Sequence, residues 1–165
     1  ERPFDHGAWV PLSLVYPKAD IPVVQLSIAS HAPPEWHYAL GRALAPLRDE
    51  GVLLIGSGSI THNLRALFSA RLPIDAPAPA WVTGFTDWVA GHMAADAVDE
   101  VLHAVERAPH GRDNHPTMDH ILPLFVAMGA GTEADGLHAA RLHASTTYGL
   151  LAMDVYAFGE GAARL

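Results

Sequence analysis

Apolar and polar residues follow one another along the chain in blocks, and the first blocks have the spacing of helices. Residues 8–16 are expected to form a short helix, and Asp5 or Gly7 is placed to cap its start. A second helix is expected at residues 34–49, where apolar side chains recur on one face. Pro46 lies inside that pattern and should kink or shorten the helix.

Two other blocks are short, nearly continuous apolar runs, as expected of strands covered on both faces. They occupy residues 21–28 and 52–59 and alternate with the two helices. This order predicts an α/β fold with a mostly parallel central sheet and helices on both faces. Ligands of such sheets lie beyond the carboxyl ends of the strands. Residues 56–63, which include His62, would lie at such an end and are therefore well placed to bind a ligand. The glycines at 56 and 58 lack the lysine of a nucleotide-binding loop, which argues against a nucleotide site.

The middle of the chain predicts a linker and then a long helical region. Residues 73–79 are rich in proline and alanine and are expected to be neither helix nor central strand. Residues 81–107 carry two apolar stripes that are out of phase, so a break is expected near residues 91–96. His92 and His103 fall within these stripes, and we expect them to be structural.

The last third of the chain predicts one more helix and a final strand. A polar loop at residues 109–114 precedes an apolar helix expected at residues 121–128. Residues 132–145 are polar and predict a surface loop or a sheet edge, and residues 146–158 are apolar and β-prone, as in a last strand.

Composition narrows the classes of function. The 165 residues suit one domain, and a formal charge of −8 argues against a nucleic-acid-binding surface. Because the chain has no cysteine, a metal ion would have to bind through His, Asp or Glu. The absence of cysteine also agrees with a cytoplasmic protein. No apolar run has the length of a membrane span, and we expect no membrane partner.

The chain has 11 histidines, and their local contexts separate candidates from structural residues. His6, His62 and His120 lie in short turn-like stretches. Thr117 or Asp119 is expected to cap the helix that follows, which would put His120 in its first turn. A helix N-terminus favours a neutral imidazole, the form that binds a metal or acts as a general base.

Several motifs in order carry a resemblance to a known family. They occupy residues 4–9, 16–28, 47–53, 56–65 and 115–124. Together they resemble the DOPA-dioxygenase-like branch of the class III extradiol ring-cleavage dioxygenases, the LigB superfamily. The resemblance covers nearly the whole chain and implies that residues 1–165 are the C-terminal portion of a single catalytic domain.

The resemblance implies an enzyme that inserts O₂ into a catechol ring next to the diol, giving a ring-opened semialdehyde. His120 matches a metal ligand, and the implied cofactor is Fe(II), with Zn(II) able to take its place. His62 matches a catalytic acid/base beside the metal and is also expected to contact it. His6 matches a catalytic and substrate-binding histidine, and His115 is expected on the substrate side. The implied partners are a small catechol and O₂.

The sequence departs from the family in one respect. Two further metal ligands, expected in Gly-His-Gly-Ser-Pro-like and Ser-Ala-His-Trp-like motifs of an N-terminal half, have no match here. The chain is therefore expected to need an N-terminal half or a partner chain, or to be inactive alone. Two other functions stay open: a zinc-dependent hydrolase that uses similar histidines, and a non-catalytic binding protein with the LigB fold.

Overall fold

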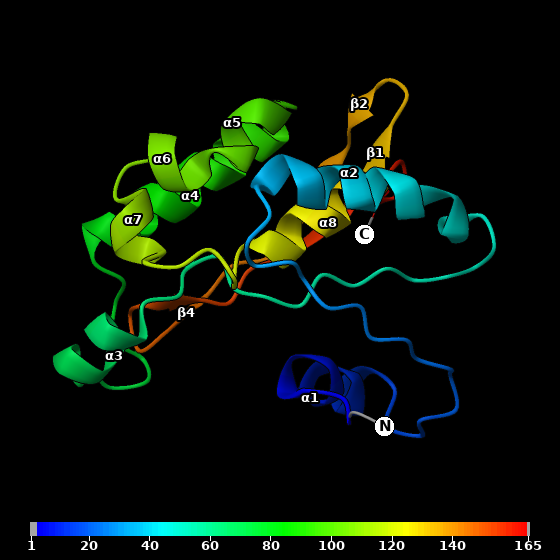
Figure 1. The fold of residues 1–165 in the computed structure, drawn as a ribbon. Helices are drawn as coiled ribbons and strands as arrows, with labels where there is room; N and C mark the ends of the chain where they lie inside the picture. The colour runs from blue at the N-terminus through cyan, green and yellow to red at the C-terminus, as the bar shows by residue number, and fades with distance from the viewer. Residues whose placement is uncertain (1–2, 165) are drawn as a thin grey trace.

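The structure is a computed structural model that describes residues 3–164. Its helices and 3-10 turns are α1 (His6–Val15), α2 (Pro34–Leu44), η1 (Ala45–Arg48), α3 (Leu64–Ala70), α4 (Ala80–Ala94), α5 (Val98–Leu102), α6 (Ala104–Arg107), α7 (Gly111–Asn114), α8 (Leu122–Gly131) and η2 (Ala162–Arg164). Its strands are β1 (Thr132–Glu133), β2 (Gly136–Leu137), β3 (Ala139–His143), β4 (Thr146–Thr147), β5 (Leu151–Ala152) and β6 (Val155–Phe158). In Figure 1, long extended segments run between α1 and the layer formed by α2 and α8.

The predicted helices are largely confirmed, and local signals explain where they begin and end. Asp5 caps α1, since its side chain accepts a hydrogen bond from the Ala8 amide. The second helix changes to the 3-10 turn η1 just before Pro46, as expected of a proline that cannot donate to the helix. The break between α4 and α5 falls at Asp96, whose φ of 56° is left-handed.

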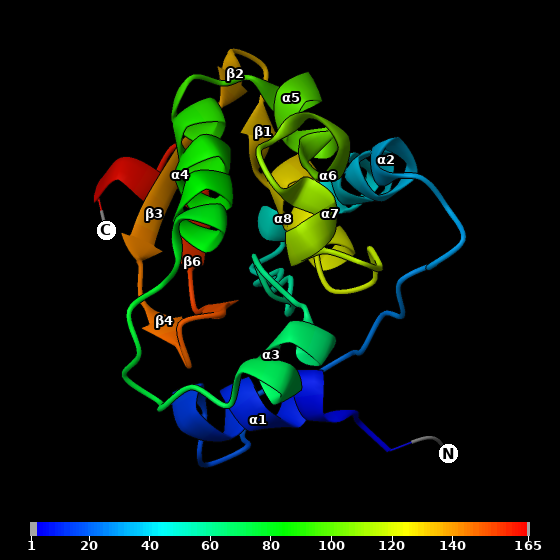
Figure 2. The ribbon, with the colours of Figure 1, turned by 90° about the vertical axis from the view of Figure 1, so that its left-hand side faces the viewer.

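The hydrophobic core lies between α4, α5, α6 and α8. Its fully buried members include Phe85, Val89, Met93, Val101, Phe125 and Met128. Helix α4 also packs on β3, as Figure 2 shows. On the opposite side α8 packs closely on α2, where Gly41 and Gly129 bring the two backbones together. These contacts make α8 the central helix of the molecule.

The fold is mixed α/β, but the mostly parallel central sheet is not confirmed. Within residues 3–164 the strands form three antiparallel pairs, β1 with β2, β3 with β6 and β4 with β5. The segment at 132–145, expected as a surface loop or an edge, contains β1, β2 and β3. The expected last strand is interrupted at Tyr148 and Gly149, whose positive φ values of 55° and 67° form a turn.

The prediction of strands at residues 21–28 and 52–59 is wrong. Both segments are extended in Figure 1, yet within the described residues neither pairs with a strand. Their apolar side chains are exposed, with Val24 93% and Leu53 66% accessible. A buried apolar strand needs neighbours on both edges and faces, and the residues described here do not supply them.

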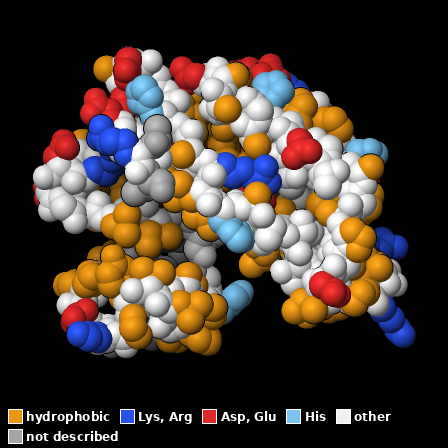
Figure 3. All heavy atoms as spheres, turned by 180° about the vertical axis from the view of Figure 1, so that it is seen from behind, with side chains coloured by type: hydrophobic (Ala, Val, Ile, Leu, Met, Phe, Trp, Pro, Cys, Tyr) orange, Lys and Arg blue, Asp and Glu red, His pale blue; other side chains and the backbone are white. Residues whose placement is uncertain are grey.

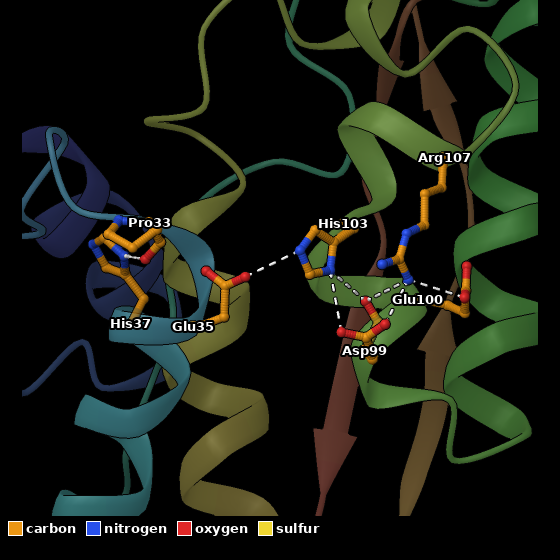
Figure 4. Close-up of polar contacts among 7 residues, drawn as sticks. All are labelled: Pro33, Glu35, His37, Asp99, Glu100, His103 and Arg107. Atoms are coloured by element: carbon orange, nitrogen blue, oxygen red, sulfur yellow. Dashed lines mark hydrogen bonds and ion pairs between the residues drawn. The ribbon is translucent and has the colours of Figure 1, made fainter.

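Polar contacts join α2 to the helices α5 and α6 at the surface (Figure 4). His103 Nε2 lies 3.0 Å from a Glu35 carboxylate oxygen, and its Nδ1 lies 2.8 Å from the Asp99 carbonyl oxygen. Arg107 pairs with Asp99 and Glu100 at 2.6 Å and 2.9 Å. These exposed contacts agree with a structural role for His103, and water and salt screen the attraction between their charges.

His37 holds the extended segment 21–29 to the start of α2 (Figure 4). Its ring is buried, with Nδ1 3.0 Å from the Pro33 carbonyl oxygen. Because that carbonyl can only accept, Nδ1 donates, and Nε2 accepts from the Ala29 amide at 3.3 Å. His92 is likewise engaged by its own helix, since its ring stacks on Trp88 and its Nδ1 lies 2.8 Å from the Trp88 carbonyl oxygen.

Candidate functional site

Two of the histidines chosen from sequence, His62 and His120, lie in direct contact. Their rings are stacked, with centroids 3.3 Å apart and planes inclined at 11°. His62 follows the extended segment 52–60, and Asn63 next to it caps α3. His120 lies in the turn immediately before α8. The fold therefore brings one imidazole from each half of the chain to the same place.

Residues 56–59, which contain Gly56 and Gly58 and are called the glycine turn below, pack directly on the start of α8. The Ser59 amide donates to the His120 carbonyl oxygen at 2.8 Å. A Cβ atom on Gly56 or Gly58 would come closer than 3.0 Å to the carbonyl oxygen of Pro123 or His120. These glycines thus permit close backbone contact, which explains them without a phosphate site.

A buried threonine fixes the loop that carries His62. The Thr61 hydroxyl donates to the Leu150 carbonyl oxygen and accepts from the Ala152 amide, each at 2.8 Å. The His62 amide donates to the Asn114 carbonyl oxygen at 2.9 Å. Sequence reasoning missed Thr61, and its one signal was a polar residue directly after the apolar Ile60.

His115 lies beneath this loop rather than at its surface. Its side chain is buried, and its Nε2 donates to the Ile60 carbonyl oxygen at 2.7 Å. Its Nδ1 has no hydrogen-bond partner among the described residues. Burial lowers the pKa of His115 to about 4, so the ring is neutral at neutral pH. Substrate contact by His115 stays a prediction, while its observed contact supports the loop.

The turn before α8 differs from the expected cap. The N-cap of α8 is Ile121, which makes no side-chain cap, so neither Thr117 nor Asp119 has the predicted role. Instead the Thr117 hydroxyl donates to the Asp119 carboxylate, and this hydrogen bond lowers the pKa of Asp119. The other Asp119 oxygen lies 2.8 Å from His120 Nδ1 as an ion-pair contact, although Nδ1 has no well-aligned hydrogen bond within the described residues. Asp119 therefore supplies negative charge beside His120.

Two features of its surroundings change the pKa of His62: burial and a neighbouring imidazole. Burial lowers the pKa of His62, and the adjacent His120 lowers it further. A neutral His62 can accept a proton from an acidic ligand and return it later. The pair therefore has the chemistry of an acid/base next to a metal-binding imidazole.

His6, the remaining sequence candidate, is the first residue of α1 and is exposed. The start of α1 lies near the glycine turn, since a Cβ atom on Gly7 would be 3.6 Å from Ser57 Oγ. The structure thus places His6 on the side of the loop that carries His62, without a recorded contact to it. Its catalytic and substrate-binding role stays a prediction.

The donor atoms here suit a metal, but their number is too small for a complete site. Imidazole is a good ligand for iron and zinc, and non-haem iron is commonly held by three protein side chains. Residues 3–164 contain no group of three or more His, Cys, Asp and Glu side chains placed to hold a metal ion. His120 and His62 would therefore provide part of a metal site.

A cleft of about 680 Å³ reaches this site. One end is lined by His120 and by residues 56–60, and the rest by α1, α8 and β6. Figure 3 shows hydrophobic side chains on both sides of the hollow that separates the part of the molecule at the lower left from the part above it. Among the described residues no helix has the length and apolar character needed to cross a membrane.

Comparison with known proteins settles the family. A family model described as the catalytic LigB subunit of aromatic ring-opening dioxygenase matches residues 1–159. The chain belongs to this family. The chain is 44% identical over 158 residues to a 4,5-DOPA dioxygenase extradiol of Beta vulgaris, and the match covers 96% of this chain and 57% of that protein.

A curated relative and a solved structure, both from Escherichia coli K12, extend the comparison. The relative, also named 4,5-DOPA dioxygenase extradiol, is 42% identical to this chain over 129 residues, which are 77% of this chain and 46% of that protein. The crystal structure is of an uncharacterized protein, with 34% identity and a TM-score of 0.76, and the match covers 95% of this chain and 64% of that chain. The chain therefore spans about half the length of the curated relatives it matches.

Proposed function

We propose that this chain forms part of an extradiol dioxygenase that inserts O₂ into a catechol next to its diol and opens the ring to a semialdehyde. The observation that carries the proposal is the contact between His62 and His120, of which His120 lines the cleft, in a chain of the LigB family. L-DOPA is the first substrate to test, because the relatives are named for it.

His120 would serve as a metal ligand, with His62 close enough to contact the same ion. A bound Fe(II) ion would supply the redox chemistry by which a catechol and O₂ react. Within residues 3–164 no third His, Asp or Glu side chain is placed with these two to hold a metal, which supports a proposal of further ligands from polypeptide outside this chain. We propose that the N-terminal half expected from the resemblance, or a partner chain, supplies them.

His62 would perform the proton transfers. A catechol must lose protons to chelate a metal, and a neutral imidazole within hydrogen-bond reach can accept one. The same nitrogen can later return the proton to the oxygen atom displaced when the O–O bond breaks, and that oxygen then adds back as water to open the expanded ring, so both atoms of O₂ stay in the product. Thr61 and His115 hold the loop that carries His62, through the Leu150 and Ile60 carbonyl oxygens. They are positioning residues in this proposal.

The test is an anaerobic Fe(II) titration with L-DOPA, followed by admission of air while O₂ uptake and the yellow ring-opened product are recorded. Three samples are compared: the 165-residue chain, the chain mixed with a polypeptide comprising the unmatched residues of the Beta vulgaris relative, and that relative intact. We expect O₂ uptake with the intact relative and with the mixture.

Each other outcome bears on the proposal directly. A mixture that binds Fe(II) and L-DOPA but consumes no O₂, while the intact relative does, would overturn it. Turnover of a hydrolysable substrate with Zn(II) and without O₂ would favour the hydrolase instead. Ring cleavage by the 165-residue chain alone would support the reaction and show that the metal site is complete here.

A further inference from the structure

A second, smaller cavity lies beside α4 where that helix packs on β3, and β4 follows below them in Figure 2. Its volume is about 230 Å³. None of the four histidines expected from sequence to act in ring cleavage lines this cavity. The cavity is therefore separate from the proposed metal site, and what it binds does not depend on the proposed reaction.

The lining of this cavity is mostly polar. Apart from two alanines, it consists of threonine and serine side chains and of three charged residues, Asp87, Arg141 and Asp154. Asp87 belongs to α4, Arg141 to β3, and Asp154 directly precedes β6. Charged groups are buried only against partners of opposite charge or hydrogen-bonding groups, so a ligand that fills this cavity has to be polar.

Arg141 and Asp154 form an ion pair in which each partner keeps unused bonding capacity. Arg141 Nε donates to Asp154 Oδ1. The Asp154 side chain is only 1% accessible, yet its Oδ2 has no hydrogen-bond partner within residues 3–164. A guanidinium group has five N–H donors, and the two Nη groups of Arg141 make no hydrogen bond to the described residues. The pair thus leaves one acceptor and several donors for a ligand.

The unpaired oxygen of Asp154 is the observation that points to a ligand, because buried polar atoms are nearly always hydrogen-bonded. Burial raises the pKa of Asp154, Arg141 opposes the rise and Asp87 adds to it, so the carboxylate lacks positive partners. Asp154 also lines the larger cleft, but Arg141 and Asp87 line only the smaller cavity. The two carboxylates together favour a cationic donor in the smaller cavity, such as an ammonium group.

Arg141 indicates a second charged group on the same ligand. The planar guanidinium fork binds carboxylates through paired hydrogen bonds. A simple cation would meet the charge of Arg141, and a simple anion would meet those of Asp87 and Asp154. A molecule with both an ammonium and a carboxylate group meets each charge with its opposite. The cavity has the volume of roughly seven water molecules at ~30 Å³ each, enough for such a molecule with a short side chain.

We propose that the cavity between α4 and β3 binds a small α-amino acid. Its ammonium group donates to Asp87 and Asp154, and its carboxylate accepts from the Nη groups of Arg141. The threonine and serine hydroxyls of the lining take part in the remaining hydrogen bonds. This binding requires neither metal nor ring cleavage, so its test is independent of the proposed function.

The test is a nuclear magnetic resonance titration of the 165-residue chain, without metal, with L-alanine. The amide resonances that shift locate the site, and their dependence on concentration gives the Kd. Ethylamine lacks the carboxylate and propionate lacks the amine, so each of these molecules probes one end of the site. We expect saturable shifts at residues 83–87 and 144–146 with L-alanine, and binding at least tenfold weaker with ethylamine or propionate, since each loses a charge-assisted hydrogen bond.

Two substitutions test the two ends of the site separately. Asp87→Asn removes the exposed charge that faces the ammonium group, so it should weaken L-alanine binding at least tenfold without weakening that of propionate. Arg141→Lys keeps a positive charge beside Asp154 but removes the Nη fork, so it should weaken L-alanine binding without weakening that of ethylamine. Asp75→Asn changes an exposed aspartate outside the cavity and should leave the Kd of L-alanine within twofold. Circular dichroism verifies that the variants are folded.

Several results would overturn the inference. These are the absence of saturable shifts with L-alanine, equal binding of the three molecules, and equal effects of Asp87→Asn and Asp75→Asn. Shifts centred on residues 56–62 would assign amino-acid binding to the cleft and also overturn it. An assembled enzyme that binds L-alanine as expected but cleaves no catechol would reject the proposed function and leave this inference standing.

Discussion

The imidazole rings of His62 and His120 lie face to face, with centroids 3.3 Å apart. Two cationic rings at this separation would repel each other, so at most one of them is readily protonated. The lowered pKa of His62 agrees with this arrangement, since burial and then His120 are its main causes. The stack therefore favours a neutral His62 beside a ring that can bind a metal.

Replacing His62 should separate proton transfer from metal binding. In the assembled enzyme, His62→Gln is expected to lower kcat/KM by about 10²–10⁴-fold, the usual loss of a general acid/base. Fe(II) affinity should fall less than with His120→Ala, which removes the proposed ligand. Steady-state O₂ uptake and Fe(II) titration provide the two measurements.

The control for this prediction is His92→Gln. His92 stacks on Trp88 within α4 and has no part in the site, so its replacement should leave kcat/KM within a few-fold of the unmodified enzyme. If His62→Gln were as active as His92→Gln, His62 would not be the acid/base.

Thr61→Val should destabilise the fold although it preserves the shape of the side chain. The change removes the donor to the Leu150 carbonyl oxygen and the acceptor for the Ala152 amide, and both groups are buried. Leaving buried polar groups unpaired costs about 1–3 kcal/mol. Urea unfolding should show this loss, whereas the exposed Thr83→Val should change the free energy of unfolding by about 0.5 kcal/mol or less.

The buried His115 should make stability depend on pH. Its folded pKa of about 4 lies below the ordinary histidine pKa of 6.5, so the unfolded chain binds the extra proton between these two values. Stability is therefore unaffected by this group above about pH 6.5 and falls as the pH drops toward 4, by about 3 kcal/mol in total.

Urea unfolding of the chain and of His115→Gln, from neutral pH down to about pH 5, measures this contribution. The variant should show a shallower loss of stability with falling pH. His138→Gln is the control, because hydrogen bonding to Asp135 raises the pKa of the exposed His138, and its contribution has the opposite sign. Equal slopes for the chain and His115→Gln would contradict the prediction.

Gly41→Ala should weaken the contact between α2 and α8. A Cβ atom at Gly41 would lie 2.8 Å from the Ala130 backbone nitrogen and closer still to the Val126 carbonyl oxygen. Overpacking of this kind costs about 1–3 kcal/mol. Gly91→Ala in α4 meets no atom within 4 Å and should instead stabilise by about 0.5–1 kcal/mol. Thermal unfolding of the two variants should therefore shift in opposite directions.

Local rules predicted the parts of the fold that depend on neighbouring residues. Asp5 caps α1, Pro46 ends α2 in a 3-10 turn, and the chain breaks at Asp96. The predictions that failed concern contacts between residues far apart in the sequence. The apolar runs at 21–28 and 52–59 have strand composition, but a strand also needs a partner, which sequence pattern does not supply.

In the candidate site too, sequence predicted features that depend on neighbouring residues and missed contacts that form only on folding. Turn contexts selected His62 and His120, and the structure brings them together. The expected cap at Thr117 or Asp119 was wrong because those two side chains bind each other, and Ile121 takes the cap position. Thr61 could not be found from sequence, since its partners at Leu150 and Ala152 become neighbours only through folding.

The contact of the glycine turn with α8 has a thermodynamic consequence. The Ser59 amide is bonded to the carbonyl oxygen of His120, so the cleft wall and the proposed metal ligand share one hydrogen bond. Under the proposed function, polypeptide that supplies further ligands and orders this wall also orders His120, so the binding of polypeptide and the binding of metal become linked equilibria. By reciprocity, the factor by which the polypeptide raises Fe(II) affinity must equal the factor by which Fe(II) raises affinity for the polypeptide.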